Sequence, residues 1–281
     1  MNCAPATTPR AALARPFLKW AGGKGRLLSQ YEPFFPASFH SYYEPFLGGG
    51  AVFFHLSARI NKAVLGDINP ELVNVYRCVR DRPKEVIAHL HHHKRRHSTD
   101  YYYRIRQQHH LSDPVARAAR LLYLNKTCYN GLYRENSRGQ FNVPLGRYKN
   151  PTICDPELLE AASAALQGTD ILEFSFAEIL DWPLSSRDFV YFDPPYHPIS
   201  PTSSFTRYNR YGFSGQNQER LAEVFKQLAR QGVQVMLSNS DCEFIRQLYQ
   251  GFSMYPMQAA RAINSQAGRR GKISELLITS Y

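Results

Sequence analysis

The chain has 281 residues, which is long enough for one large domain or for one domain that carries an insertion. Hydrophobic residues make up 43% and charged residues 20%, which excludes a disordered or fibrous protein, and no apolar run approaches the ~20 residues of a membrane-spanning helix. With 34 Lys and Arg against 23 Asp and Glu, the net charge of +11 favours a nucleic-acid partner over a membrane surface, because no basic amphipathic anchor is evident.

The first part of the chain predicts alternating strands and helices after a flexible tail over residues 1–16. Residues 41–44 predict a short strand that runs into three glycines, followed by an apolar helix over 51–56. A second strand begins at residue 62 and ends at Asp67. Pro70 suits the first turn of a helix and predicts one that continues through residue 80.

The middle of the chain has a different pattern. Residues 81–127 stay helical, with breaks at Pro83 and at residues 113–114. Residues 128–150 lose the helical periodicity and predict a hairpin or loop. Its expected turns are at Gly131, Gly139 and Gly146.

Strands and helices alternate again after residue 170. The later elements are strands over 189–192, 233–237 and 276–278 and a helix over 216–230. We therefore predict an α/β fold with a sheet domain interrupted by a helical insertion. The expected parts are a catalytic domain over 17–69 and 155–281 and an insertion over 70–154.

The positive charge is concentrated in this insertion. Residues 94–150 contain twelve Lys or Arg and three acids, and so carry +9 of the net +11. The same segment holds eight Tyr or Phe. Basic side chains interleaved with aromatic rings suit phosphate neutralisation and stacking on bases, which predicts contact with nucleic acid.

Residues 193–196, Asp-Pro-Pro-Tyr, form the strongest local motif and directly follow an apolar strand. Two consecutive prolines cannot continue a sheet, so the chain leaves the strand rigidly at its carboxyl end, where ligands bind in open α/β sheets. The corner brings together the Asp193 carboxylate, the Pro194 carbonyl and the Tyr196 ring. Two acceptors beside an aromatic ring fit a planar amine such as adenine N6 or cytosine N4.

The glycines at 48–50 lie between a strand and a helix, where they let a ligand approach the backbone closely. The spacing does not match a dinucleotide fingerprint, because Phe53 replaces the third glycine, and Lys24 is not followed by the Ser or Thr of a P-loop. Asp67 ends the second strand and, by analogy with dinucleotide sites, can accept hydrogen bonds from ribose hydroxyl groups.

No metal site is predicted. The five cysteines are odd in number and form no C-x-x-C pair, which opposes a disulfide framework or a structural zinc site and suits a reducing cytosol. His89, His93 and His97 share one helix face, but no acid or cysteine completes a metal shell, and a solvated basic helix is the favoured interpretation. A basic cluster at residues 269–272 is interpreted as a phosphate-binding loop.

These motifs, taken in order, resemble the Dam family of DNA adenine-N6 methyltransferases, the D12 class with the alpha motif order. The resemblance rests on residues 17–24, 44–50, 67–69 and 193–196 and on the middle stretches 129–134, 141–144 and 146–148. It implies a class I S-adenosylmethionine-dependent methyltransferase fold, with an inserted helical DNA-recognition domain that carries a β-hairpin.

The resemblance also implies roles for single residues. It places S-adenosylmethionine against Trp20 and Lys24, the cofactor ribose on Asp67, and the methyl donor and target base beside Asp193. From the glycine motif we include Glu44, Phe46, Gly48 and Gly50 among the cofactor-binding residues.

For DNA, the resemblance implies that Lys19 and Arg134 read guanines and that Leu132 and Pro144 contact a thymine methyl group, which are also physically expected pairings. It makes Tyr129 a wedge in the duplex. Lys126, Asn130 and Tyr148 complete the expected DNA-binding set. The family's best-known target is 5′-GATC-3′, although this chain departs from the pattern at Lys126, Tyr133 and Glu135.

The expected reaction is methylation of adenine N6 in duplex DNA after the base is flipped into the 193–196 corner, with Asp193, Pro194 and Tyr196 as catalytic residues. A methyltransferase for cytosine N4 or RNA, or a DNA-binding module with a vestigial pocket, are the alternatives. We expect a cytoplasmic monomer, associated with the nucleoid through DNA and without an obligatory protein partner.

Overall fold

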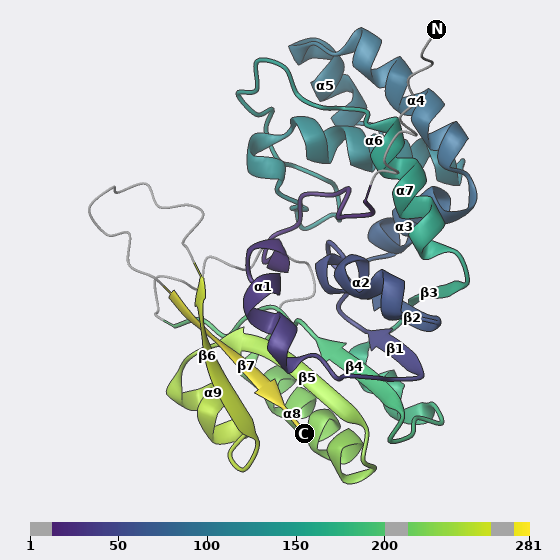
Figure 1. The fold of residues 1–281 in the computed structure, drawn as a ribbon. Helices are drawn as coiled ribbons and strands as arrows, with labels where there is room; N and C mark the ends of the chain where they lie inside the picture. The colour runs from purple at the N-terminus through teal and green to yellow at the C-terminus, as the bar shows by residue number, and fades with distance from the viewer. Residues whose placement is uncertain (1–12, 200–212, 260–272) are drawn as a thin grey trace, which may run out of the picture.

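The computed structural model describes residues 13–199, 213–259 and 273–281 (Figure 1). Most of the predicted tail and the whole basic cluster at 269–272 therefore lie outside the described residues. None of the described helices is long and apolar enough to cross a membrane.

A seven-stranded sheet forms the lower half of the molecule in Figure 1, in the order β3-β2-β1-β4-β5-β7-β6. The strands are β1 Ser41–Glu44, β2 Lys62–Asp67, β3 Thr169–Glu173, β4 Asp188–Phe192, β5 Gln234–Ser240, β6 Ser253–Ala259 and β7 Ile273–Thr279. The pairs from β3 to β5 are parallel, whereas β7 runs antiparallel to both β5 and β6. The predicted mostly parallel α/β fold is confirmed.

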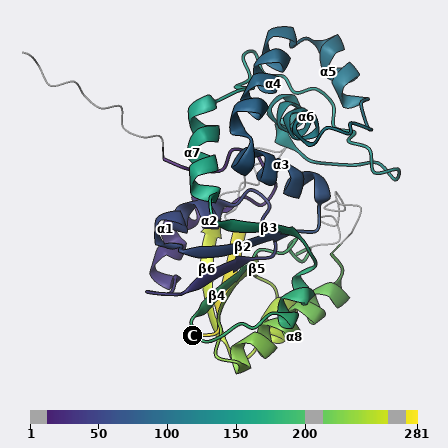
Figure 2. The ribbon, with the colours of Figure 1, turned by 90° about the vertical axis from the view of Figure 1, so that its right-hand side faces the viewer.

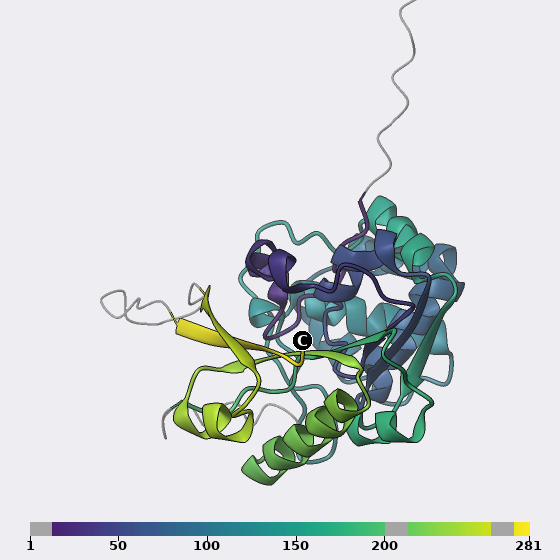
Figure 3. The ribbon, with the colours of Figure 1, turned by 60° about the horizontal axis from the view of Figure 1, so that its bottom comes forward.

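Side chains of β4 alternate between the two faces of the sheet, as the period of two along a strand requires. Phe189 and Tyr191 pack into a large core that extends toward the insertion, whereas Val190 and Phe192 pack into a second core under α8 (Gly215–Arg230). Figure 3 shows α8 on one side of the sheet and α2 (Ala51–Leu56) on the other. Burial on both faces explains why β4 is a continuous apolar run.

The remaining helices are α1 Leu28–Tyr31, α3 Pro70–Asp81, α4 Pro83–Arg96, α5 Thr99–Arg106, α6 Pro114–Thr127, α7 Pro156–Leu166 and α9 Glu243–Leu248. Their starts follow capping chemistry: the side chains of Asn69, Ser98, Asp113 and Asp155 accept backbone N–H bonds at the first turns of α3, α5, α6 and α7. The breaks at Pro83 and before Pro114 lie where the sequence predicts them. The further break at Ser98 was not predicted.

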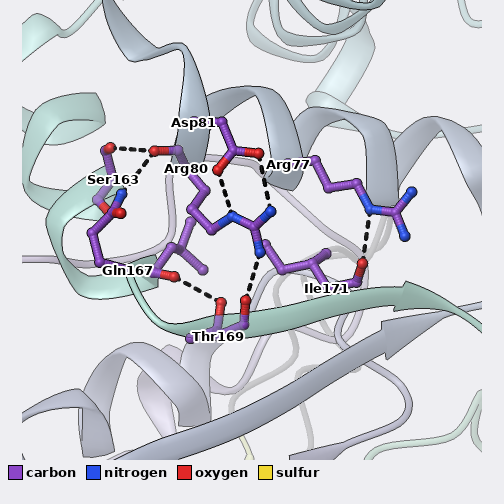
Figure 4. Close-up of polar contacts among 8 residues, drawn as sticks. Arg77, Arg80, Asp81, Ser163, Gln167, Thr169 and Ile171 are labelled. Atoms are coloured by element: carbon purple, nitrogen blue, oxygen red, sulfur yellow. Dashed lines mark hydrogen bonds and ion pairs between the residues drawn. The ribbon is translucent and has the colours of Figure 1, made fainter.

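Helix α3 connects the sheet to the helical region, as Figure 2 shows. Arg77 donates from Nε to the Ile171 carbonyl oxygen at 2.7 Å, and Arg80 donates to the Thr169 carbonyl oxygen at 2.5 Å (Figure 4). Ser163 of α7 in turn donates to the Arg80 carbonyl oxygen at 2.8 Å. These bonds hold α3 against the edge strand β3 and α7 against α3. The domain boundary at residue 70 stays a prediction.

Residues 128–150 form an irregular hairpin. Antiparallel bridges join Cys128 to Leu145 and Glu135 to Phe141, without regular strands. Gly131 and Gly139 have φ of 65° and 73°, a left-handed conformation that favours glycine at turns. The predicted hairpin is present, but its shape depends on irregular contacts rather than on a β ladder.

Candidate active site

Polar side chains meet at the carboxyl ends of the parallel strands, and Asp193 lies at the centre of this edge. The Lys24 ammonium is 2.8 Å from Asp193 Oδ1, and its side chain is only 3% exposed. Ser238 of β5 donates to the same oxygen at 3.0 Å, and the Tyr191 hydroxyl lies 2.9 Å from Ser238 Oγ. The carboxylate is thereby fixed from two neighbouring strands and from the N-terminal motif.

The proline corner after β4 is supported by buried amides. Gln218 of α8 donates to the Pro195 carbonyl oxygen at 2.9 Å and accepts a hydrogen bond from the Asn239 side chain, also at 2.9 Å. Asn239 Oδ1 accepts the backbone N–H of His197 at 3.2 Å. The corner is thus held on both sides, which fixes the direction in which Asp193 points.

The Tyr196 ring forms one wall of the site. Lys24 Nζ lies 4.6 Å from the ring centroid, and the Tyr196 hydroxyl donates to Glu275 Oε2 at 2.6 Å. Glu275 reaches this edge because β7 is antiparallel to β5, which places the beginning of β7 beside the end of β5. The hydrogen bond to Glu275 orients the Tyr196 ring, and the Lys24 ammonium contacts the face of the ring.

Burial dominates the electrostatics of the site. It raises the pKa of Asp193 above the ordinary value for an aspartate, and the neighbouring Lys24 ammonium opposes that rise. Burial likewise raises the pKa of Glu275, again opposed by Lys24. Perturbed carboxyl groups at a sheet edge are typical of a functional site.

Asp67 and the glycine loop form the neighbouring part of the edge. Asp67 accepts the backbone N–H groups of Gly48 at 3.1 Å and Asn69 at 2.9 Å, and burial raises its pKa to about 6. Gly48 has a φ of 48°, and a Cβ atom there would come within 2.9 Å of the Trp20 ring. The loop therefore needs glycine for its conformation and for close contact with Trp20.

Other residues of the glycine motif are more enclosed. Glu44 is 2% exposed, accepts a bond from the Tyr42 hydroxyl at 2.8 Å, and has a pKa raised by burial to about 8. Gly50 has a φ of 65° and lies against Tyr76, while Phe46 stacks on Phe176 with ring centroids 5.4 Å apart. Their roles toward a cofactor stay predictions.

The expected DNA-reading residues lie on and around the irregular hairpin. Lys19 Nζ is 3.2 Å from the Tyr148 hydroxyl and 4.3 Å from the centroid of that ring. Tyr129 is 49% exposed, and its backbone N–H donates to the Pro144 carbonyl oxygen at 2.9 Å. Pro144 is exposed, and so are Lys19 and Tyr148. All four side chains are therefore accessible to a ligand.

Of the remaining predicted DNA contacts, Asn130 is exposed, and Lys126, Leu132 and Arg134 are half-buried. Arg134 donates from Nε to Asn142 Oδ1 at 2.6 Å across the hairpin. Leu132 is half-buried against the large core, and Asn130, with a φ of 54°, forms the turn before it. Lys126 is half-buried, and burial lowers its pKa to about 8. Each of these roles stays a prediction.

Several residues of the site were not predicted from the sequence. Gln218, Ser238, Asn239 and Glu275 all reach the 193–196 corner or its supports. A polar Ser-Asn-Ser run at the end of the apolar strand β5 was the one available signal for two of them. Gln218 and Glu275 depend on how α8 and β7 pack, which no local pattern shows.

One histidine of the histidine-rich helix α4, His93, is buried against the neighbouring helices. His93 lies 2.8 Å from the Tyr101 hydroxyl and stacks on Tyr123 at 4.8 Å, and burial lowers its pKa to about 4. His97 Nδ1 lies 2.9 Å from the Tyr123 hydroxyl. In the described ranges no three His, Cys, Asp or Glu side chains gather closely enough to hold a metal ion.

The strand order, with the antiparallel β7 between β5 and β6, defines a class I S-adenosylmethionine-dependent methyltransferase fold. The glycine loop, the acid that ends β2 and the carboxylate after β4 lie at the edge where such a fold binds its ligands. Residues 20–263 match the family model for D12 class N6 adenine-specific DNA methyltransferase. The chain belongs to this family.

Three curated relatives align over nearly the whole chain. The Type II methyltransferase M1.LlaDCHI of Lactococcus lactis subsp. cremoris is 44% identical and covers 95% of each chain. The Type II methyltransferase M.MjaIII of Methanocaldococcus jannaschii is 42% identical over 95% of this chain and 99% of its own. The DNA adenine methylase of Escherichia coli strain K12 is 38% identical over 94% of each chain.

Proposed function

We propose that this chain is a site-specific DNA methyltransferase that transfers a methyl group from S-adenosylmethionine to adenine N6 in duplex DNA. The observation that carries the proposal is the half-buried Asp193 carboxylate, fixed by Lys24 and Ser238 at a proline corner beside the Tyr196 ring. Membership of the family supplies the class of reaction, and the corner supplies residues suited to it.

The residues at the glycine loop fit the proposed cofactor. Asp67 offers carboxylate oxygens suited to ribose hydroxyl groups, and Gly48 keeps the backbone beside it free of a side chain. Trp20 covers that glycine with an aromatic surface. When bound, S-adenosylmethionine supplies an activated methyl group on a sulfonium centre, so the protein needs no nucleophile or metal of its own.

The proposed role of the corner is to bind and polarise the target amine. The side chains of Lys24 and Ser238 both contact Asp193 at Oδ1, and the proposed acceptor for the substrate amine is Oδ2. If Asp193 and the Pro194 carbonyl accept the two N–H bonds, they draw the nitrogen lone pair out of conjugation and stabilise the developing positive charge. Tyr196 stacks on the base, which must leave the duplex to reach this depth.

We further propose a target of 5′-GATC-3′, on the family resemblance of the hairpin. The exposed Tyr129 suits a wedge, and Arg134 and Lys19 suit guanine contacts in the major groove. Base recognition by side chains in the major groove favours duplex DNA as the substrate, because the major groove of A-form RNA is too narrow for side chains to enter. Such an enzyme would act in the cytoplasm, on the nucleoid DNA.

A transfer assay with tritiated S-adenosylmethionine tests the proposal on duplex DNA, single-stranded DNA and RNA of matched sequence. We expect label mainly in the duplex, and digestion of the product to yield N6-methyladenine. Label in cytosine or in RNA would establish one of the alternative substrates. Sequence-specific duplex binding with no transfer to any substrate would indicate a vestigial pocket.

A further inference from the structure

One buried side-chain amide binds both the N-terminal motif that carries Lys19 and Trp20 and the irregular hairpin over residues 128–150. Asn125, at the end of α6, is 1% exposed. Its Oδ1 accepts the backbone N–H of Lys19 at 2.9 Å, and its Nδ2 donates to the carbonyl oxygens of Lys19 at 2.7 Å and of Gly131 at 3.0 Å. One side chain therefore ties the motif and the hairpin to the same helix end.

A second connection is aromatic. The Tyr133 ring of the hairpin stacks on the Trp20 ring, with centroids 5.3 Å apart and planes 28° from parallel. The Tyr133 hydroxyl donates to Glu135, and its ring also meets Phe141 edge-on at 5.9 Å. Tyr133 is thus fixed within the hairpin and presents one face to Trp20.

These contacts continue into the candidate cofactor site. Trp20 lies directly against Gly48, whose N–H donates to Asp67 at 3.1 Å. In the other direction, a Cβ atom on Gly131 would come within 2.5 Å of the Lys19 side chain, so the motif also packs tightly on the hairpin turn. An unbroken series of contacts therefore runs from Asp67 through Gly48 and Trp20 to Tyr133.

We propose that Tyr133 and Asn125 couple the binding of the methyl donor to the binding of the target duplex. Both act as positioning residues, because they reach the ligands only through Trp20 and Lys19. A donor that orders Trp20 would order the hairpin, and a duplex that orders the hairpin would tighten donor binding by the same factor, as thermodynamic linkage requires. This inference rests on the proposed function, because it assigns donor and duplex to the two ends of one series of contacts.

The test measures the dissociation constant of sinefungin, an unreactive donor analogue, by calorimetry with and without a saturating duplex that contains one GATC site. For the unmodified chain we expect the duplex to tighten sinefungin binding by about tenfold, a typical coupling factor. Tyr133→Leu removes the stacking and should reduce that factor to near one. Tyr133→Phe keeps the ring and should retain the coupling.

Tyr103→Leu is the matched control, because Tyr103 is a half-buried tyrosine of α5 whose ring meets Tyr102 and Arg106 instead. It should leave the coupling unchanged. In Asn125→Asp the two donated bonds are lost at constant size, and the coupling should also fall. Because this change is buried and can unfold the chain, Tyr133→Leu is the decisive variant.

A fluorescence measurement separates coupling from simple destabilisation. Trp20 and Trp182 are the two tryptophans of the chain, so Trp182→Phe leaves Trp20 as the sole tryptophan reporter. Duplex addition should change Trp20 emission in the Trp182→Phe chain and not after the further change Tyr133→Leu. Normal methyl transfer with full coupling in Tyr133→Leu would overturn the inference alone, whereas failure of the unmodified chain to bind sinefungin would overturn the proposed function as well.

Discussion

The carboxyl edge of the sheet and the irregular hairpin over residues 128–150 position their side chains in different ways. At the sheet edge, Asp193 is fixed by contacts from separate elements, and burial shifts its pKa. In the hairpin, Tyr129 and Pro144 are exposed, and two isolated bridges replace a regular ladder. Catalysis needs a preorganised, water-poor environment, whereas base reading needs accessible side chains on a locally fixed backbone.

The largest expected effect is at the sheet edge. Asp193→Asn keeps the shape of the side chain but removes the charge that would stabilise a developing cation. We expect the rate of methyl transfer to fall by at least about 10²–10³-fold, with sinefungin binding largely retained. Single-turnover transfer and calorimetry measure the two quantities. Asp170→Asn, an exposed carboxylate of β3, is the control and should keep full activity. Normal turnover in Asp193→Asn would refute the assigned role.

The hairpin should respond in selectivity rather than in chemistry. Arg134→Ala removes a bidentate group suited to guanine, and we expect discrimination against a substituted guanine in the target to fall by about 5–150-fold. The ratio of kcat/KM on matched and altered duplexes measures this change. Arg138→Ala, in the exposed turn of the same hairpin, should leave the ratio unchanged. An unaltered ratio in Arg134→Ala would remove this residue from base reading.

A smaller effect concerns the pH dependence of the sheet edge. The Lys24 ammonium lowers the pKa of Asp193, so Lys24→Met should raise that pKa further. In the proposed mechanism the ionised carboxylate is the reactive form, so the acid limb of kcat/KM should move to higher pH, with a several-fold greater loss at pH 6 than at pH 8. Arg26→Met, an exposed change two residues away, should leave the profile in place. If Lys24→Met lowers kcat/KM by the same factor at every pH, the electrostatic interpretation is contradicted.

The smallest predicted effect is on stability. Burial raises the pKa of Glu44 from 4.5 to about 8, so the folded chain holds this proton more tightly than the unfolded chain does. The contribution of the Glu44 carboxyl group to the free energy of unfolding is therefore greatest below about pH 4.5 and is lost as the pH rises to about 8. Glu44→Gln removes that loss. Calorimetric melting should show a smaller drop in the midpoint between pH 5 and pH 8, by about ten degrees, since one pKa unit is about 1.4 kcal/mol and 1 kcal/mol corresponds to about 2–4 °C in a large domain. If the melting midpoint falls equally in the unmodified chain and in Glu44→Gln, a group other than Glu44 causes the pH dependence of stability.

The same two regions show how far the sequence could predict the molecule. The positions of Asp67 and Asp193 at the carboxyl ends of β2 and β4 were predictable. Apolar runs, glycines and prolines determine where a strand ends through their effect on the neighbouring backbone. The position of Glu275 was not predictable, because this residue lies 82 residues after Asp193 and reaches it only through the antiparallel pairing of β7 with β5. Asn125 was missed for a related reason: its partners are backbone atoms 106 and six residues away. Side chains that bind distant backbone leave no periodic signal.

The decisive experiment on the proposed reaction maps the methylated bases in unmodified genomic DNA after incubation with the purified chain and S-adenosylmethionine. We expect N6-methyladenine to be confined to one short sequence motif and to disappear when Asp193→Asn replaces the unmodified chain. Methyl groups on cytosine N4, or N6-methyladenine formed equally well by Asp193→Asn, would contradict it.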